Sequence, residues 1–228
     1  MSKTILVTGA NRGLGLEVCK IFYRKNWDVA GTSRSEEGIN FLQRGCSGSR
    51  GHICDITNPK DIEKLLADVT GDFSKLDVLV NNAAIPGKGE IEKIKEEKVR
   101  KVIETNLVGT INMSIQASEI MKRQGFGHII NVASTFGIET SEGFALYCAS
   151  KHGLVGFTRS LMRELSPGIN VSIIYPGGMK TDFHDSPRPD FLDPKEVAKA
   201  IYFIATRPYN ALVSELTITP KNERKYIR

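Results

Sequence analysis

The strongest constraint on how this chain can fold is a regular alternation of short β-branched runs with longer amphipathic segments. Such alternation is typical of β–α–β units, in which a helix crosses over to join two parallel strands. Several runs are apolar on both faces, which predicts strands covered by helices on two sides. The sequence therefore predicts an α/β fold with a parallel sheet of about seven strands flanked by helices. Strands are expected at residues 4–8, 28–33, 52–56, 77–82, 128–134, 170–176 and 214–218, and helices at 13–25, 36–45, 59–71, 97–123, 144–165 and 194–206.

The chain has 228 residues, a length that suits one large α/β domain. No internal repeat, low-complexity stretch or linker interrupts the pattern. We therefore expect residues 1–228 to form a single domain.

The net charge of +5 raises the possibility of a nucleic-acid partner. The basic residues are interleaved with acids, however, as in "EIEKIKEEKVRK" at residues 90–101, which is typical of a solvated helix face. The chain also lacks a recognition helix and any interleaving of aromatic with basic residues. We expect no nucleic-acid partner.

The four cysteines, Cys19, Cys46, Cys54 and Cys148, form no CxxC pair and no cluster with histidine at metal-ligand spacing. This pattern predicts no metal site and favours reduced thiols in the cytoplasm. The N-terminal apolar run is too short for a signal peptide, and no segment reaches the ~20 apolar residues of a membrane span. We expect no membrane association.

A glycine-rich stretch, "TGANRGLG" at residues 8–15, directly follows the first expected strand and opens a helix. In that context Gly9 lets the chain turn, Gly13 leaves room for a pyrophosphate, and Gly15 allows the helix to pack closely on the sheet. The helix N-terminus then offers free N–H groups to phosphates. The spacing is G-x-x-x-G-x-G rather than the commoner G-x-G-x-x-G, but the position after a first strand favours dinucleotide binding.

The end of the second expected strand, "GTSRS", bears on which dinucleotide is bound. An NAD site usually has an acidic residue here for the ribose hydroxyl, whereas an NADP site has an arginine for the 2′-phosphate. Ser33 and Arg34 occupy these positions, and Arg12 in the glycine turn can supply a second cation. The pattern favours NADP(H) over NAD(H). The alternative is that both arginines are ordinary surface charges and that Glu36 or Glu37 meets the ribose.

Tyr147 and Lys151 lie four positions apart in an expected helix, so their side chains share one face. A carbonyl that accepts a hydride also needs a proton, and a nearby ammonium lowers the pKa of a phenol, ordinarily near 10, so that it can act as an acid or base. Ser134, at the end of the fifth expected strand, can polarise the carbonyl oxygen. Each residue alone has a simpler explanation, a surface pair or a turn cap. Their occurrence together with the glycine turn favours redox chemistry.

These motifs occur in the order and at the spacing of the short-chain dehydrogenase/reductase family, which the chain resembles over nearly its whole length. "TGANRGLG" resembles T-G-x-x-x-G-x-G, and "NNAA" at 81–84 is similar to N-N-A-G with Ala84 replacing glycine. "TNLVG" carries Asn106 at the family's catalytic asparagine, "NVAST" carries Ser134, and "YCASK" matches Y-x-x-x-K. "PGGMKT" at 176–181 resembles P-G-x-x-x-T. The implied fold is a Rossmann-type doubly wound sheet in which one domain both binds the dinucleotide and carries out catalysis.

The resemblance also implies roles for individual residues. Tyr147 would donate the proton, Lys151 would lower its pKa and hold the nicotinamide ribose, and Ser134 would orient the substrate oxygen. Asn106 would distort its helix and help to hold a water linking Lys151 to solvent. Asp55 would accept the adenine amino group, and Thr181 would contact the nicotinamide amide. The implied cofactor contacts are Gly9, Asn11, Arg12, Gly13, Leu14, Gly15, Ser33, Arg34, Asp55, Ile56, Asn82, Ala83, Tyr147, Lys151, Pro176, Gly177, Met179 and Thr181.

The function implied is an NADPH-dependent reductase of ketones or aldehydes, acting on a 3-oxoacyl thioester or a small carbonyl compound. The alternatives are an NAD(H)-dependent alcohol dehydrogenase of the same family and a non-catalytic protein that senses NADPH. The short loop at 182–192 suggests an open pocket, in which His184 and Arg188 either contact an anionic substrate or are simply solvated. Packing of the two long helices predicts a homodimer. A tetramer is possible, although the segment after the last strand lacks the glycine-rich tail of tetrameric members.

Overall fold

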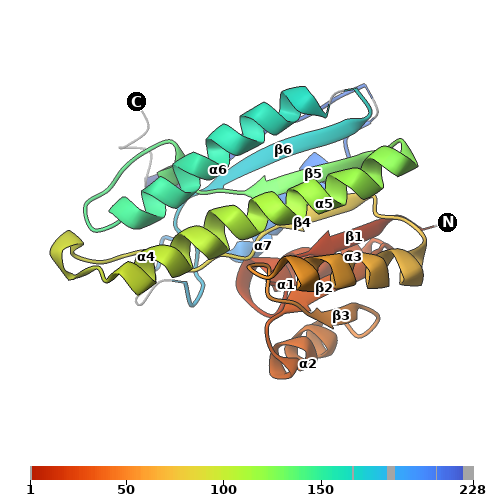
Figure 1. Ribbon diagram of the computed structural model, residues 1–228, viewed down its shortest axis with the longest axis horizontal. Coiled ribbons are helices and arrows are strands. Elements are labelled where there is room, and N and C mark those ends of the chain that lie inside the picture. The colour runs from red at the N-terminus through yellow and green to blue at the C-terminus, as the bar shows by residue number, and fades with distance from the viewer. Residues whose placement is uncertain (1, 166, 184–187, 209, 223–228) are drawn as a thin grey trace.

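The computed structural model describes the whole chain except residues 1, 166, 184–187, 209 and 223–228. Its centre is one seven-stranded sheet in the order β3-β2-β1-β4-β5-β6-β7, and every neighbouring pair is parallel (Figure 1). The predicted doubly wound α/β fold is therefore confirmed. The strands are β1 (Thr4–Val7), β2 (Asp28–Ser33), β3 (Arg50–Ile53), β4 (Val78–Asn81), β5 (Gly127–Val132), β6 (Ile169–Pro176) and β7 (Glu215–Ile218).

Helices cover both faces of this sheet. They are α1 (Gly13–Arg24), α2 (Glu36–Gly45), α3 (Pro59–Phe73), α4 (Glu96–Ile103), α5 (Gly109–Gln124), α6 (Ala145–Glu164) and α7 (Pro194–Ala205). In Figure 1, α3, α5 and α6 lie in front of the sheet and α7 lies behind it. Three apolar clusters result among the described residues: one joins α1, α2 and α7 to the sheet, another joins α3, α5 and α6 to it, and a smaller one joins α6 to β6. Strands β1 and β4 are buried along their whole length between these layers, which is why they read as continuous apolar runs.

The order of the strands reverses between β1 and β4. The chain moves outward from β1 to β2 and β3, and then returns to the other side of β1 to continue with β4, β5 and β6. At such a reversal the connections leave the carboxyl ends of neighbouring strands in opposite directions, which opens a crevice there. The glycine turn and the segments that follow β2, β4, β5 and β6 all meet at this edge of the sheet.

Two of the expected elements differ from the structure. The third strand is Arg50–Ile53 rather than 52–56, because Asp55 accepts hydrogen bonds from the backbone N–H and the hydroxyl of Thr57 and forms a turn in place of a strand. The helix expected at 97–123 is divided into α4 and α5 by a π-helical turn, Glu104–Val108, centred on Asn106. In the described residues no helix is both long enough and apolar enough to cross a membrane.

Candidate functional site

A cavity of about 1180 Å³ lies at the carboxyl edge of the sheet. Small-molecule sites commonly measure about 300–1,000 Å³, so this cavity has room for a cofactor together with a second molecule. Every site residue expected from the sequence lines it except Gly15 and Asn106. Among the described residues, no group of three or more His, Cys, Asp or Glu side chains is placed to hold a metal ion.

The glycine turn has the backbone that its sequence predicted. Gly9 and Gly13 have φ values of +64° and +52°, in the left-handed region that glycine adopts without strain. Gly15 lies behind the cavity wall, where a Cβ atom would stand 2.2 Å from the carbonyl oxygen of Gly9. It therefore acts through close packing of α1 on the turn and not by lining the cavity.

The turn is held against the end of β4 by a set of short hydrogen bonds. The hydroxyl of Thr8 accepts from the backbone N–H groups of Asn82 and Ala83, both at 3.0 Å. In return the side-chain amide of Asn82 donates to the carbonyl oxygens of Thr8 and Gly9 at 2.9 and 3.1 Å. These hydrogen bonds explain why Thr8 begins the glycine motif and Asn82 belongs to the NNAA motif. Together the two residues fix the floor of the cavity.

The floor of the cavity suits an anion. No side chain caps the N-terminus of α1 and no acidic residue lies in its first turn, whereas Ser35, Asn58 and Asp193 cap α2, α3 and α7. Free N–H groups at a helix N-terminus attract phosphate.

Two exposed guanidinium groups border the same end of the cavity. Arg12 and Arg34 both line it, and Arg12 also lies 3.6 Å from a carboxylate oxygen of Asp182, which lines the cavity too. Glu36 and Glu37, the alternative ribose contacts, do not line the cavity but lie in the first turn of α2. This arrangement agrees with a site that binds a phosphate group rather than with one in which a carboxylate binds the ribose hydroxyl.

The residues that the sequence predicted to take part in proton transfer lie together in another part of the cavity. Tyr147 and Lys151 project from α6 on one face, as their spacing predicted, and the ammonium of Lys151 lies 5.7 Å from the centre of the Tyr147 ring. Lys151 also donates to the carbonyl oxygen of Val132 at 2.9 Å. Ser134 follows β5 and caps a short 3₁₀ turn, Thr135–Gly137, by accepting from the N–H of Phe136. Ser134 therefore caps a turn, as the simpler explanation proposed, and it also lines the cavity.

Burial dominates the acidity of this pair. Loss of hydration raises the pKa of Tyr147 above its ordinary value of 10, and a hydrogen bond with Ser134 acts in the opposite direction without reversing the shift. Burial also lowers the pKa of Lys151 to about 8. The expected lowering of the Tyr147 pKa by Lys151 is thus not the net effect in this structure, because both groups are shielded from water and the lysine bonds a backbone carbonyl.

Asn106 lies outside the cavity wall and is completely buried. Its side-chain amide accepts from the N–H of Ile85 at 2.8 Å and donates to the carbonyl of Ile85 at 3.0 Å and to the hydroxyl of Ser150 at 3.2 Å. Ser150 in turn donates to the carbonyl of Tyr147 at 2.8 Å. The helix distortion expected at this residue is present as the π-helical turn, and it joins the segment after β4 to the helix that carries Tyr147.

The segment after β6 closes one side of the cavity. Thr181 packs against the glycine turn, with its methyl carbon 3.3 Å from where a Cβ of Gly13 would stand. The segment folds back on itself, since Met179 bridges Leu192 and the N–H of Lys180 donates to the carbonyl of Leu192. Arg188 lines the cavity and pairs with Asp190 at 3.5 Å. His184, the other residue considered for this loop, lies outside the described residues.

Sequence reasoning missed three phenylalanines that line the cavity around Tyr147: Phe136, Phe144 and Phe183. The signal was available, because Phe136 is two residues after Ser134, Phe144 is three before Tyr147, and Phe183 is two after Thr181. Side chains this close in sequence to three expected site residues share their surroundings.

Comparison with known proteins adds independent findings. The sequence profile of the short chain dehydrogenase family matches residues 3–190. The 3-oxoacyl-acyl-carrier-protein reductase FabG of Vibrio cholerae is 36% identical over 220 residues, covering 90% of each chain. Carbonyl reductase family member 4 of Xenopus tropicalis is 32% identical over 220 residues, covering 92% of this chain and 93% of that protein.

Two solved structures share the fold closely. A crystal structure of actinorhodin polyketide ketoreductase with NADPH has a TM-score of 0.89 and 31% identity, covering 96% of both chains. ElxO with NADP bound has a TM-score of 0.90 and 27% identity, covering 98% of this chain and all of that one.

Proposed function

The chain belongs to the short-chain dehydrogenase/reductase family, and we propose that it is an NADPH-dependent reductase of ketones or aldehydes. The observation that carries the proposal is the division of one cavity between two ends. Arg12 follows β1 and Arg34 follows β2, and both line the cavity. Ser134 follows β5, on the other side of β4 in the sheet, and lines the cavity together with Tyr147 and Lys151. A phosphate-rich cofactor and a carbonyl substrate would require these two environments side by side.

The residues at the first end fit NADPH. The positive φ values in the glycine turn and the uncapped N-terminus of α1 leave room and N–H donors for the pyrophosphate. Arg34 and Arg12 would bind the 2′-phosphate, which NADH lacks. Asp55, Lys151 and Thr181 would hold the adenine, the nicotinamide ribose and the nicotinamide amide. Both NADP-type structures described above agree with this choice of cofactor.

In the proposed reaction Lys151 and Thr181 would hold the reduced nicotinamide, which would supply a hydride for the carbonyl carbon. Ser134 donates a hydrogen bond to the substrate oxygen and so fixes its orientation. Tyr147 gives its phenolic proton to that oxygen as the alcohol forms. The raised pKa of Tyr147 keeps the proton in place at neutral pH, and the Lys151 ammonium stabilises the tyrosinate that remains. Asn106 holds the segment after β4 against α6 and thereby positions Tyr147.

The relatives point to 3-oxoacyl thioesters as the first substrates to test, since the Vibrio cholerae protein is named a 3-oxoacyl-acyl-carrier-protein reductase. Small ketones and aldehydes are the second group, in view of the carbonyl reductase of Xenopus tropicalis. Both groups present the C=O bond that the Tyr147 end of the cavity suits.

The test is NADPH consumption by wild type and by Tyr147→Phe, measured by absorbance with a panel of these carbonyl compounds. The variant keeps the ring but has no proton to donate, so turnover should fall at least about a thousandfold, within the range of general acid catalysis. NADPH binding, followed by fluorescence titration, should change less than about threefold. Tyr23→Phe is the control, because Tyr23 is 39% exposed and does not line the cavity. A fully active Tyr147→Phe enzyme would refute the role, and NADPH binding without any turnover in wild type would favour a sensing protein.

We also propose that the protein acts in the cytoplasm as a single-domain subunit of a homodimer. All four cysteines are free and buried, as suits a reducing compartment. The outer face of α5 carries an exposed apolar side chain, Ile115, and pairing of the two long helices with those of a second copy would cover it. Light scattering on the protein as it elutes from a size-exclusion column would measure the number of subunits per particle. A monomer would refute the proposed dimer.

A further inference from the structure

The Tyr147 end of the cavity has a continuous aromatic wall, formed by Phe144, Phe136, Tyr147 and Phe183. The centres of successive rings lie 4.9, 6.4 and 5.5 Å apart. These distances fall within or near the range in which aromatic rings interact favourably. The proton donor is therefore the third of four rings in a row.

Three of the rings come from the stretch 136–147, and the fourth comes from the segment after β6. Phe136 follows β5 in the 3₁₀ turn, Phe144 precedes α6, and Phe183 belongs to the segment after β6. The ring planes are tilted by 50° between Phe136 and Phe144 and by 58° between Tyr147 and Phe183. A flat aromatic guest can thus meet a ring face and a ring edge at once, the two contacts that aromatic quadrupoles favour.

The three phenylalanine rings are only partly buried, and each lines the cavity. Apolar surface that remains in contact with water in a concave site gains free energy when a ligand covers it. Toward the end bordered by Arg12 and Arg34, the apolar side chains of Leu14 and Ile56 also line the cavity, but each is only 5% exposed. The apolar part of a substrate is therefore directed to the Tyr147 end.

The charged side chains that line the cavity near the aromatic wall are of both signs, so they do not select an acidic substrate. They are Lys151, Lys180, Glu139 and Asp182. Glu139 lines the cavity close in sequence to Phe136, and a carboxylate repels an anion. Arg188 lines the same cavity, but its guanidinium stands 3.5 Å from Asp190 and 4.8 Å from the centre of the Phe191 ring. Its charge is thus already matched within its own loop.

From these observations we propose that the preferred substrates are uncharged carbonyl compounds with an aromatic ring attached at or next to the C=O group. This inference rests on the proposed function, because it takes the Tyr147 end as the place where the carbonyl is reduced. The aromatic wall would stack the ring of the substrate while Ser134 and Tyr147 bond its oxygen.

The experiment compares two ketones of similar size in wild type, acetophenone and cyclohexyl methyl ketone, which differ in the aromaticity of the ring. Aromatic pairing adds about two- to tenfold to binding beyond burial alone. We expect kcat/KM for acetophenone to exceed that for the saturated ketone by about that factor. The ratio should fall in Phe144→Leu and in Phe136→Leu, which keep apolar bulk but remove a ring.

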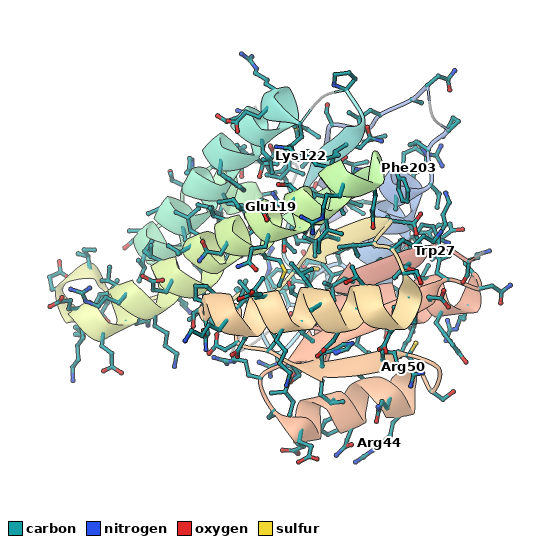
Figure 2. All side chains as sticks on the ribbon, turned by 45° about the vertical axis from the view of Figure 1, so that its right-hand side comes forward. Trp27, Arg44, Arg50, Glu119, Lys122 and Phe203 are labelled. Atoms are coloured by element: carbon teal, nitrogen blue, oxygen red, sulfur yellow. The ribbon has the colours of Figure 1, made fainter. Side chains whose placement is uncertain are left out.

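Phe203→Leu is the matched control. Phe203 is 44% exposed on α7, outside the cavity, and Figure 2 shows it with the ribbon of that helix. The ratio should be unchanged in this variant, and thermal unfolding would establish that all three variants fold. Equal kcat/KM for the two ketones in wild type, or a ratio that Phe144→Leu and Phe136→Leu leave unchanged, would overturn the inference.

Binding without turnover separates this inference from the proposed function. The dissociation constants of the two ketones can be measured by calorimetry on Tyr147→Phe saturated with NADPH. Tighter binding of acetophenone, lost in the Tyr147→Phe/Phe144→Leu double variant, supports the aromatic site even if no carbonyl compound is turned over. If wild type reduces both ketones rapidly and their dissociation constants are equal, the proposed function stands and the aromatic preference is refuted.

Discussion

Asn106 and Ile85 exchange two hydrogen bonds across the base of the site, one from the Ile85 N–H to Oδ1 of Asn106 and one from Nδ2 of Asn106 to the Ile85 carbonyl. The side chain thus pairs with a backbone segment as a neighbouring strand would. The π-helical turn at Glu104–Val108 places an extra residue in the helix at this point. π-Turns of this kind often mark functional sites.

Replacing Asn106 with alanine should therefore reduce both stability and turnover. The change leaves the backbone groups of Ile85 without partners, which costs about 1–3 kcal/mol for each one that stays buried. We expect the free energy of unfolding in urea to fall by about 2–3 kcal/mol and kcat to fall more than KM rises. Asn40→Ala, an exposed position on α2, should change neither quantity. A variant with normal kcat would show that the asparagine serves stability alone.

Gly15→Ala should abolish cofactor binding, because the new Cβ would stand 2.2 Å from the Gly9 carbonyl and 2.7 Å from the side-chain amide of Asn82. Backbone cannot yield as a flexible side chain can, so α1 would have to move away from the turn. The matched substitution is Gly156→Ala in α6, where a Cβ meets nothing within 4 Å. That change should raise stability by about 0.5–1 kcal/mol, as alanine is the better helix former. Calorimetric titration with NADPH and urea unfolding would measure the two effects.

Arg34→Ala should change the choice of cofactor. Losing a charged hydrogen bond to the 2′-phosphate typically costs about 1.5–3 kcal/mol, and the exposure of Arg34 places the expected effect near the lower limit. We expect the KM for NADPH to rise about tenfold while the KM for NADH stays constant. Arg44→Ala is the control. Arg44 lies in the last turn of α2, beside Phe41. Figure 2 labels it on that helix, away from β1. An equal rise for both cofactors would contradict a phosphate contact.

The rate of carbonyl reduction should fall as the pH rises through about 8. Burial sets the pKa of Lys151 to about 8, so the ammonium is present below that pH and is lost above it. Tyr147 keeps its proton throughout this range because its own pKa is raised. Without the ammonium, tyrosinate formation is less favourable, and kcat/KM should decrease by up to tenfold per pH unit above the midpoint. The measurement is a pH–rate profile between 6 and 10 at saturating NADPH, and a flat profile would contradict the role of the lysine charge.

Much of this protein could be read from local patterns in its sequence. Burial between two helical layers makes the central strands β1 and β4 nearly continuous apolar runs, so they could be recognised without a structure. The left-handed backbone at Gly9 and Gly13 needs glycine, and that need is visible in a motif of eight residues. The spacing of Tyr147 and Lys151 predicted one shared helix face because a helix repeats every 3.6 residues.

What the tertiary structure alone decided depends on contacts between distant segments. The family resemblance implied a distortion of the helix at Asn106, but its bonding partners, Ile85 and Ser150, are 21 and 44 residues away, and no periodicity reveals them. The pKa of Tyr147 depends on how completely the fold excludes water from its hydroxyl. The spacing between Tyr147 and Lys151 in the sequence does not indicate the degree of burial. The aromatic wall likewise joins Phe136 and Phe144, both from the connection between β5 and α6, to Phe183 from the segment after β6, and these two segments meet only where the sheet ends. Local periodicity encodes secondary structure, whereas burial and long-range contacts exist only once the chain has folded.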